Sequence, residues 1–67
     1  MTTQELKVRI DEIKEVSHIG DHEKAHSLED ELYRDVLVAI CKGTPNYKQL
    51  ALMALQTQKL DFSRWCA

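Results

Sequence analysis

The chain has 67 residues, of which 43% are hydrophobic and 30% are charged, and its formal net charge at pH 7 is −2. A domain of this size buries only about 60% of the surface that its unfolded chain exposes, so a single thin core is expected. The longest apolar run, residues 36–41, is too short to cross a bilayer, and the polar first five residues do not form a signal peptide. These features exclude a membrane-spanning or exported protein and predict one cytoplasmic domain.

Acidic residues are concentrated in the first part of the chain. Residues 1–41 hold ten acids against five Lys and Arg, whereas residues 42–67 hold one acid against four. This distribution would repel a phosphate backbone, which excludes direct nucleic-acid binding. The acids either keep one helix face in water or form a surface for a basic protein partner. The candidates for such a surface are Glu29, Asp30, Glu31 and Asp35.

The first helix is predicted over residues 2–19. Thr2 and Glu5 have the spacing of a capping box, and Gly20 is expected to end the helix in a left-handed conformation. Hydrophobic residues recur at helical spacing and predict one core-facing stripe. This stripe consists of Leu6, Ile10, Ile13 and Val16.

The second helix is predicted over residues 21–42, with Asp21 as its N-cap and Gly43 as its end. Because residues 36–41 are apolar all round, its second half is expected to be buried on several sides. The core-facing residues are expected to be Ala25, Leu28, Leu32, Val36 and Ala39.

The third helix is predicted over residues 45–58, with Thr44 as its N-cap and Pro45 at its first position. Leu52 and Met53 point away from the expected core, and this surplus of apolar surface indicates a protein partner or a homo-oligomer. The inward residues are expected to be Tyr47, Leu50, Ala51, Ala54 and Leu55.

The tail is predicted to form a single capped turn after the third helix. Phe62 and Trp65 are three residues apart, so one face of such a turn would close the bottom of the core with both rings. The predicted fold is therefore an all-α, three-helix domain over residues 1–67.

The segment His22-Glu-Lys-Ala-His26 matches the HExxH pattern of zinc proteases. It opens a helix, however, in a chain without a predicted strand or an extended ligand motif. Glu23-x-x-His26 also has the spacing found in helical di-iron proteins, but a second such helix is missing. We therefore interpret His22 as a surface residue and His26 as a partly buried residue bonded to an acid. A metal site of His22, Glu23 and His26 is the alternative.

The remaining chemistry is sparse. Cys41 and Cys66 lack the spacing of a zinc finger and are expected to be reduced thiols. No nucleophile elbow or glycine-rich phosphate loop is present in the sequence. The sequence thus predicts a protein that is not an enzyme and has no cofactor.

A distinctive order of residues covers most of residues 23–67. Its members are Glu23, His26, Glu29, Asp30, Leu32, Tyr33, Val36, Leu37, Ala39 and Ile40, then Ala54, Leu55, Thr57, Leu60, Asp61, Phe62, Arg64, Trp65, Cys66 and Ala67. This order resembles a pattern in small, uncharacterised proteins of bacteriophages and prophages. The resemblance implies a bacterial cytoplasm and an accessory protein that binds a host factor, and it carries over no catalytic residue. It also fits a polar and aromatic clasp between the second helix and the tail, formed by His26, Asp30, Asp61, Arg64 and Trp65.

We therefore expect an interaction protein that contacts its partner through the acids of the second helix or through Leu52 and Met53. A metal-binding protein and a homo-oligomer that holds a nucleotide between protomers are the alternatives.

Overall fold

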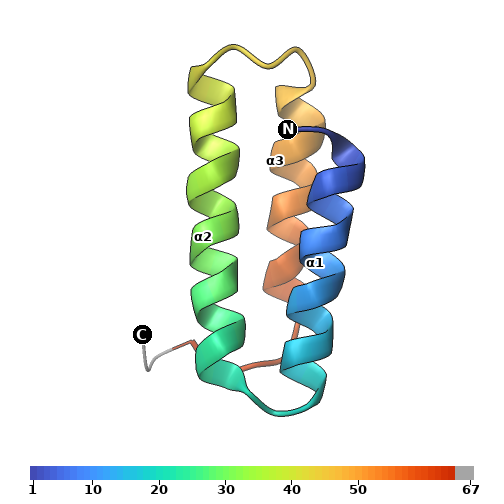
Figure 1. Ribbon diagram of the computed structural model, residues 1–67, viewed down its shortest axis with the longest axis vertical. Coiled ribbons are helices and arrows are strands. Elements are labelled where there is room, and N and C mark those ends of the chain that lie inside the picture. The colour runs from blue at the N-terminus through green and yellow to red at the C-terminus, as the bar shows by residue number, and fades with distance from the viewer. Residues whose placement is uncertain (65–67) are drawn as a thin grey trace.

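A computed structural model describes residues 1–64, and Trp65, Cys66 and Ala67 lie outside the described residues. These 64 residues form α1 (Thr3–His18), α2 (His22–Cys41), α3 (Tyr47–Leu55) and a short 3₁₀ helix, η1 (Gln56–Lys59). The three α-helices lie side by side and successive helices run in opposite directions, while the tail crosses the end of the bundle towards the start of α2 (Figure 1). The prediction of an all-α fold with three helices is confirmed.

Local signals set the bounds of α1 and α2 as the sequence predicts. The Glu5 backbone N–H donates to Thr2 Oγ1 at 3.1 Å, and the Lys24 backbone N–H donates to Asp21 Oδ1 at 3.2 Å. Gly20 and Gly43 follow the two helices with φ of 89° and 86°. Residues other than glycine rarely adopt a backbone conformation in this region. Each predicted bound therefore agrees with the structure to within one residue.

The predicted start of the third helix is wrong. Asn46, and not Thr44, is the residue before the first turn of α3, so Pro45 belongs to the connection. The Thr44 hydroxyl donates to Asn46 Oδ1 and its backbone N–H donates to the Ala39 carbonyl, which extends the end of α2 by a turn. α3 also ends at Leu55 instead of residue 58, because the chain tightens into η1.

The core lies where α1, α2 and α3 face one another. All four residues of the predicted α1 stripe are buried, whereas Leu28 and Ala39 of the α2 stripe are half-buried. Tyr47 and Leu55, which the sequence places inward, are 47% and 52% exposed. The buried hydrophobic residues are Leu6, Ile10, Ile13, Val16, Ala25, Leu32, Val36, Leu50, Ala54 and Phe62.

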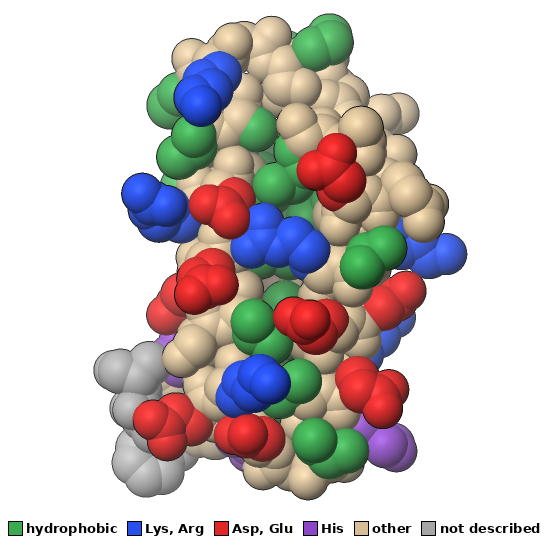
Figure 2. Space-filling model, in the orientation of Figure 1, with side chains coloured by type: hydrophobic (Ala, Val, Ile, Leu, Met, Phe, Trp, Pro, Cys, Tyr) green, Lys and Arg blue, Asp and Glu red, His purple; other side chains and the backbone are tan. Residues whose placement is uncertain are grey.

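The second half of α2 is not buried on several sides, contrary to the prediction. Leu37 is 62% exposed, Val38 is 38% exposed and Cys41 is exposed. Because α1 and α3 both pack on one side of α2, its opposite side has no neighbour within the described residues. Apolar side chains accordingly reach the surface over the C-terminal half of α2 (Figure 2). Within residues 1–64, no helix is long and apolar enough to cross a membrane.

The two glycines provide a test of the connections. A Cβ added at Gly20 or Gly43 would meet no atom within 4 Å, so only the positive φ opposes a side chain there. We expect Gly20→Ala to lower the free energy of unfolding by about 1 kcal/mol, and Gly20→Asn to lower it by less, since Asn tolerates this region. Urea unfolding followed by circular dichroism measures both changes, and equal stability of Gly20→Ala and wild type would contradict the strain.

Candidate functional site

Arg64 binds the tail to α2 through an ion pair with the buried carboxylate of Glu29. Arg64 Nε and Nη2 donate to the two carboxylate oxygens of Glu29 at 2.8 and 3.1 Å. Nη2 also donates to the carbonyl oxygens of Thr57 and Leu60 at 2.9 and 3.2 Å. Glu29 is only 3% exposed, and the planar guanidinium matches the geometry of its carboxylate. We call Glu29, Arg64 and these two carbonyl groups the tail clasp.

Both charges of the tail clasp are stabilised by their surroundings. Burial would raise the pKa of the Glu29 carboxyl, but hydrogen bonding to Arg64 and Thr57 and the charge of Arg64 hold that pKa below its ordinary value. The hydrogen bonds with Glu29 raise the pKa of the Arg64 guanidinium. The ion pair therefore persists at neutral pH.

Aromatic and hydroxyl groups complete the surroundings of the clasp. The Thr57 hydroxyl donates to the Ala54 carbonyl at 2.9 Å, which leaves its oxygen to accept from the Tyr33 hydroxyl at 2.6 Å. Burial raises the pKa of Tyr33. The Arg64 guanidinium carbon lies 3.8 Å from the centroid of the buried Phe62 ring, a cation–π contact. Charge, hydroxyl and ring contacts thus all fix the tail in one position.

The structure assigns a different acid to the clasp that the sequence predicts. Arg64 pairs with Glu29 and not with Asp30. The Asp61 side chain is exposed and makes no hydrogen bond within the described residues, although its carbonyl accepts from Ser17 Oγ at 3.5 Å. Trp65, the fifth predicted member, lies outside the described residues.

Glu29 is also withdrawn from the predicted partner-binding acids, because its carboxylate is buried. A signal for this burial was present in the sequence. Glu29 lies four residues after Ala25 and three before Leu32, both of which face the core, so it occupies the core-facing register of α2.

The other predicted acids lie at the surface. Asp30 and Glu31 are exposed, whereas Asp35 accepts from Arg9 Nη1 at 2.9 Å and lies 3.6 Å from Arg34 Nη1. On the face that includes α1 and α2, acidic side chains alternate with basic ones and do not merge into one patch (Figure 2). A uniformly acidic docking face is therefore absent from this view of the described residues.

The candidate metal ligands make contacts within the chain. His22 Nδ1 accepts from the Ser63 backbone N–H at 3.2 Å. His26 Nε2 lies 3.4 Å from Asp30 Oδ1 and its side chain is 13% exposed, as expected for a partly buried histidine beside an acid. Glu23 is exposed. In residues 1–64, no group of three His, Cys, Asp or Glu side chains is close enough to hold a metal ion.

An apolar groove runs between α2 and α3. Its volume is about 350 Å³, and Leu37 and Leu55 on its two sides are 62% and 52% exposed. Leu52 of α3 is 63% exposed, whereas Met53, predicted to share its exposure, packs against the core. Gln58 is the one lining residue with an amide or charged side chain. The groove is lined by Tyr33, Val36, Leu37, Ile40, Ala51, Ala54, Leu55 and Gln58.

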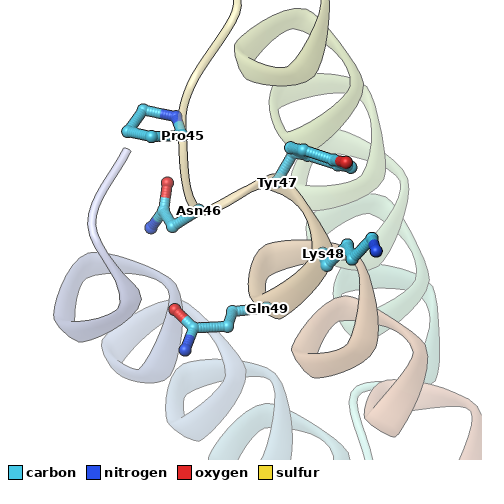
Figure 3. Close-up of a pocket in the computed structure, with 5 residues that line it drawn as sticks. All are labelled: Pro45, Asn46, Tyr47, Lys48 and Gln49. Carbon is cyan, nitrogen blue, oxygen red and sulfur yellow. The ribbon is translucent and has the colours of Figure 1, made fainter.

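A second hollow, of about 480 Å³, lies at the start of α3 (Figure 3). Its five lining residues are consecutive, from Pro45 to Gln49. Tyr47 and Lys48 point to the opposite side of the helix from Asn46 and Gln49, so these side chains do not converge on one point (Figure 3). This hollow lacks the convergent polar groups of a ligand site.

No protein-family model, curated protein or solved structure matches the chain. The geometry makes the apolar groove the candidate functional site. The tail clasp holds the α3 side of this groove in place, because Arg64 bonds the Thr57 carbonyl just after α3.

Substitutions of Arg64 test the tail clasp. We expect Arg64→Ala to lower the free energy of unfolding by about 2 kcal/mol, because it leaves the Glu29 carboxylate buried without a partner, with an allowance for the partial exposure of Arg64. Arg64→Lys should recover part of this loss, since it keeps the charge but not the paired hydrogen bonds. The control is Arg9→Ala, which removes the more exposed pair with Asp35 and should cost under about 1 kcal/mol in urea unfolding. Equal losses for Arg64→Ala and Arg9→Ala would contradict a special role of the clasp.

The lowered pKa of Glu29 predicts how stability depends on pH. The clasp contributes fully above the ordinary carboxyl pKa of 4.5, and this contribution is lost as the pH falls through the lower pKa of the folded state. We expect Glu29→Gln to be less stable than wild type at pH 7, and the difference between the two to shrink as the pH falls below 4.5. Thermal unfolding of both proteins over this range measures the difference. A constant difference would show that Glu29 has the same pKa in the folded and unfolded chain.

Proposed function

We propose that the protein is a non-enzymatic protein-interaction module whose apolar groove between α2 and α3 receives an apolar helix face of a partner. The observation that carries this proposal is the groove itself, with Leu37 and Leu55 more than half exposed on its two sides. Leaving large side chains in water forgoes about 25 cal/mol for each Å² of apolar surface, and a partner helix would recover it.

The form of the groove favours a helix over a small molecule. Helix-in-groove recognition uses side chains that repeat along one face of the partner helix. The groove has a matching form, because it is lined along its two sides by α2 and α3, which lie side by side. A small-molecule site instead requires several polar groups that fix orientation. Gln58 and the Tyr33 hydroxyl are the polar side-chain groups lining the groove, and the Tyr33 hydroxyl already bonds Thr57.

The resemblance to small phage and prophage proteins supports a bacterial host protein as the partner and the bacterial cytoplasm as the place of action. The exposed side chains of Asp30 and Glu31 would contribute at the margin of the contact, by steering a basic partner. A buried Glu29 does not take part.

Leu55 and Val8 form a matched pair for testing the groove. Leu55 is 52% exposed and lines it, whereas Val8 is 58% exposed on α1 and lies outside it. We expect the wild-type protein to capture one host protein from bacterial lysate at stoichiometric yield. Leu55→Glu should reduce this capture at least about tenfold, because it buries a charge in the contact, and Val8→Glu should leave it unchanged.

Circular dichroism of both variants controls for folding. Capture that survives Leu55→Glu would refute the groove as the contact surface. The absence of any stoichiometric host protein on the wild-type chain would refute the host partner.

A further inference from the structure

The α3 side of the apolar groove is basic. Residues 42–60 contain no acid, and Lys48 and Lys59 within them are both exposed. Among residues 1–64, neither lysine takes part in an ion pair. The excess of Lys and Arg in the second part of the chain is thus partly a pair of free positive charges on the segment that forms one wall of the groove.

The two lysines lie near opposite ends of that wall. Lys48 is seven residues before Leu55, which is a rotation of about 700°, so the two side chains lie on nearly the same line of α3. Leu52 lies between them and is 63% exposed. At the other end, Lys59 directly follows the lining residue Gln58. The wall therefore presents exposed leucines between two cations.

The α2 side of the groove carries charges of both signs. Asp30 and Arg34 are exposed one turn apart, and each adjoins the lining residues Tyr33 and Leu37 in a shallow hollow on α2. Asp30 also lies 3.4 Å from His26. Because these charges largely offset one another, only the α3 side of the groove has a single sign.

This difference selects the charges of a helix that lies along the groove. Such a helix turns its apolar face inward, and its two flanks lie over α2 and α3. Carboxylates on the α3 flank would meet Lys48 and Lys59, while a basic residue on the other flank would meet Asp30 without conflict. Seven residues of α-helix and four of 3₁₀ helix separate the two lysines by about 18 Å, which corresponds to about three turns of a partner helix.

We propose that the apolar groove receives an amphipathic helix whose flank over α3 carries Asp or Glu at two positions about three turns apart, facing Lys48 and Lys59. This inference rests on the proposed function and names the chemistry of the partner. The apolar contact holds the helix in the groove, and the two carboxylates distinguish it from other amphipathic helices.

Two synthetic peptides that differ only in charge test this partner. Both are amphipathic helices of about 18 residues with a leucine face, and one flank carries either two Glu or two Lys about three turns apart. Fluorescence anisotropy measures the dissociation constants, and circular dichroism checks that the two peptides are equally helical. The wild type should bind the Glu peptide about tenfold more tightly in low salt, because two attractive contacts replace two repulsive ones. In about 0.5 M salt the preference should fall below about threefold.

Charge reversal on the protein supplies the matched control. Lys48→Glu/Lys59→Glu should invert the preference, so that the Lys peptide binds more tightly. Lys7→Glu/Lys14→Glu makes the same change in formal charge at exposed positions of α1, which does not line the groove, and should keep the preference to within about threefold of the wild type. Equal affinity of the wild type for the two peptides, or equal loss of the preference in both double variants, overturns the proposal.

A neutral substitution locates the peptides in the groove. Leu37 lines the α2 wall, and Leu37→Ala should weaken the binding of both peptides at least about threefold through lost apolar contact. Binding of the Glu peptide that is unaffected by Leu37→Ala would place the contact outside the groove and overturn the proposal.

Anionic lipid is the competing class of partner for a surface of leucines and lysines. A groove is hollow between its walls whereas a bilayer is flat, so the geometry favours the helix. Co-sedimentation with phosphatidylglycerol vesicles tests the alternative. Vesicle binding that is lost in Lys48→Glu/Lys59→Glu, with equal affinity for the two peptides, would assign the lysines to a membrane surface and overturn the proposal.

The two proposals fail separately, because the peptide measurements need no host protein. A wild type whose host capture depends on Leu55, but which binds the two peptides equally or binds neither, would overturn the acidic flank alone. A preference for the Glu peptide without any captured host protein would overturn the host partner alone.

Discussion

Glu29 occupies a position of α2 that faces the core, and a carboxylate there costs several kcal/mol unless a cation and hydrogen-bond donors meet it. The tail of the chain supplies them. Arg64 reaches Glu29 only because the chain turns away from the axis of α3 after Leu55, tightens into η1 and crosses the end of the bundle. The shortness of α3, the orientation of the Thr57 and Leu60 carbonyls and the burial of Phe62 are all consistent with this one requirement.

The same arrangement explains why α2 has two different sides. Its inner side is fully used by α1, α3 and the tail, which contact it through Ala25, Leu32, Val36 and the Glu29 carboxylate. Three short helices can enclose only the line where they meet, and Val36 is the last fully buried residue of α2. Leu37 and Val38 then remain at the surface, although they belong to the most apolar stretch of the chain. The apolar groove and the exposure of Leu37 and Val38 therefore arise from the small number of helices.

Much of the fold could be predicted from local signals. The four buried residues of α1 follow strict helical spacing, and Thr2, Asp21, Gly20 and Gly43 bound the first two helices through backbone geometry that acts within a few residues. These features are readable because they depend on neighbours in the sequence.

The errors occurred where specific contacts, and not residue type alone, decide the outcome. Thr44 and Pro45 have the residue types of a helix start, but Thr44 instead bonds Ala39 and Asn46 in the connection. The register of Glu29 between Ala25 and Leu32 indicates a core-facing position, but its partner Arg64 lies 35 residues later and does not follow from that register. The exposure of residues 37, 38 and 41 could not be predicted from their apolarity, because it depends on how many helices the chain can place around α2.

The path of the tail also governs how α3 can move. A helix of nine residues is too short to persist alone in water, so α3 exists only while it is packed. It is held at one end by the connection after Gly43 and at the other by an ion pair that spans 35 residues of chain. The clasp therefore resists detachment of α3, because Arg64 joins the Thr57 and Leu60 carbonyls that follow α3 to Glu29 of α2. One wall of the apolar groove is thereby kept in place by an electrostatic contact that lies outside the groove.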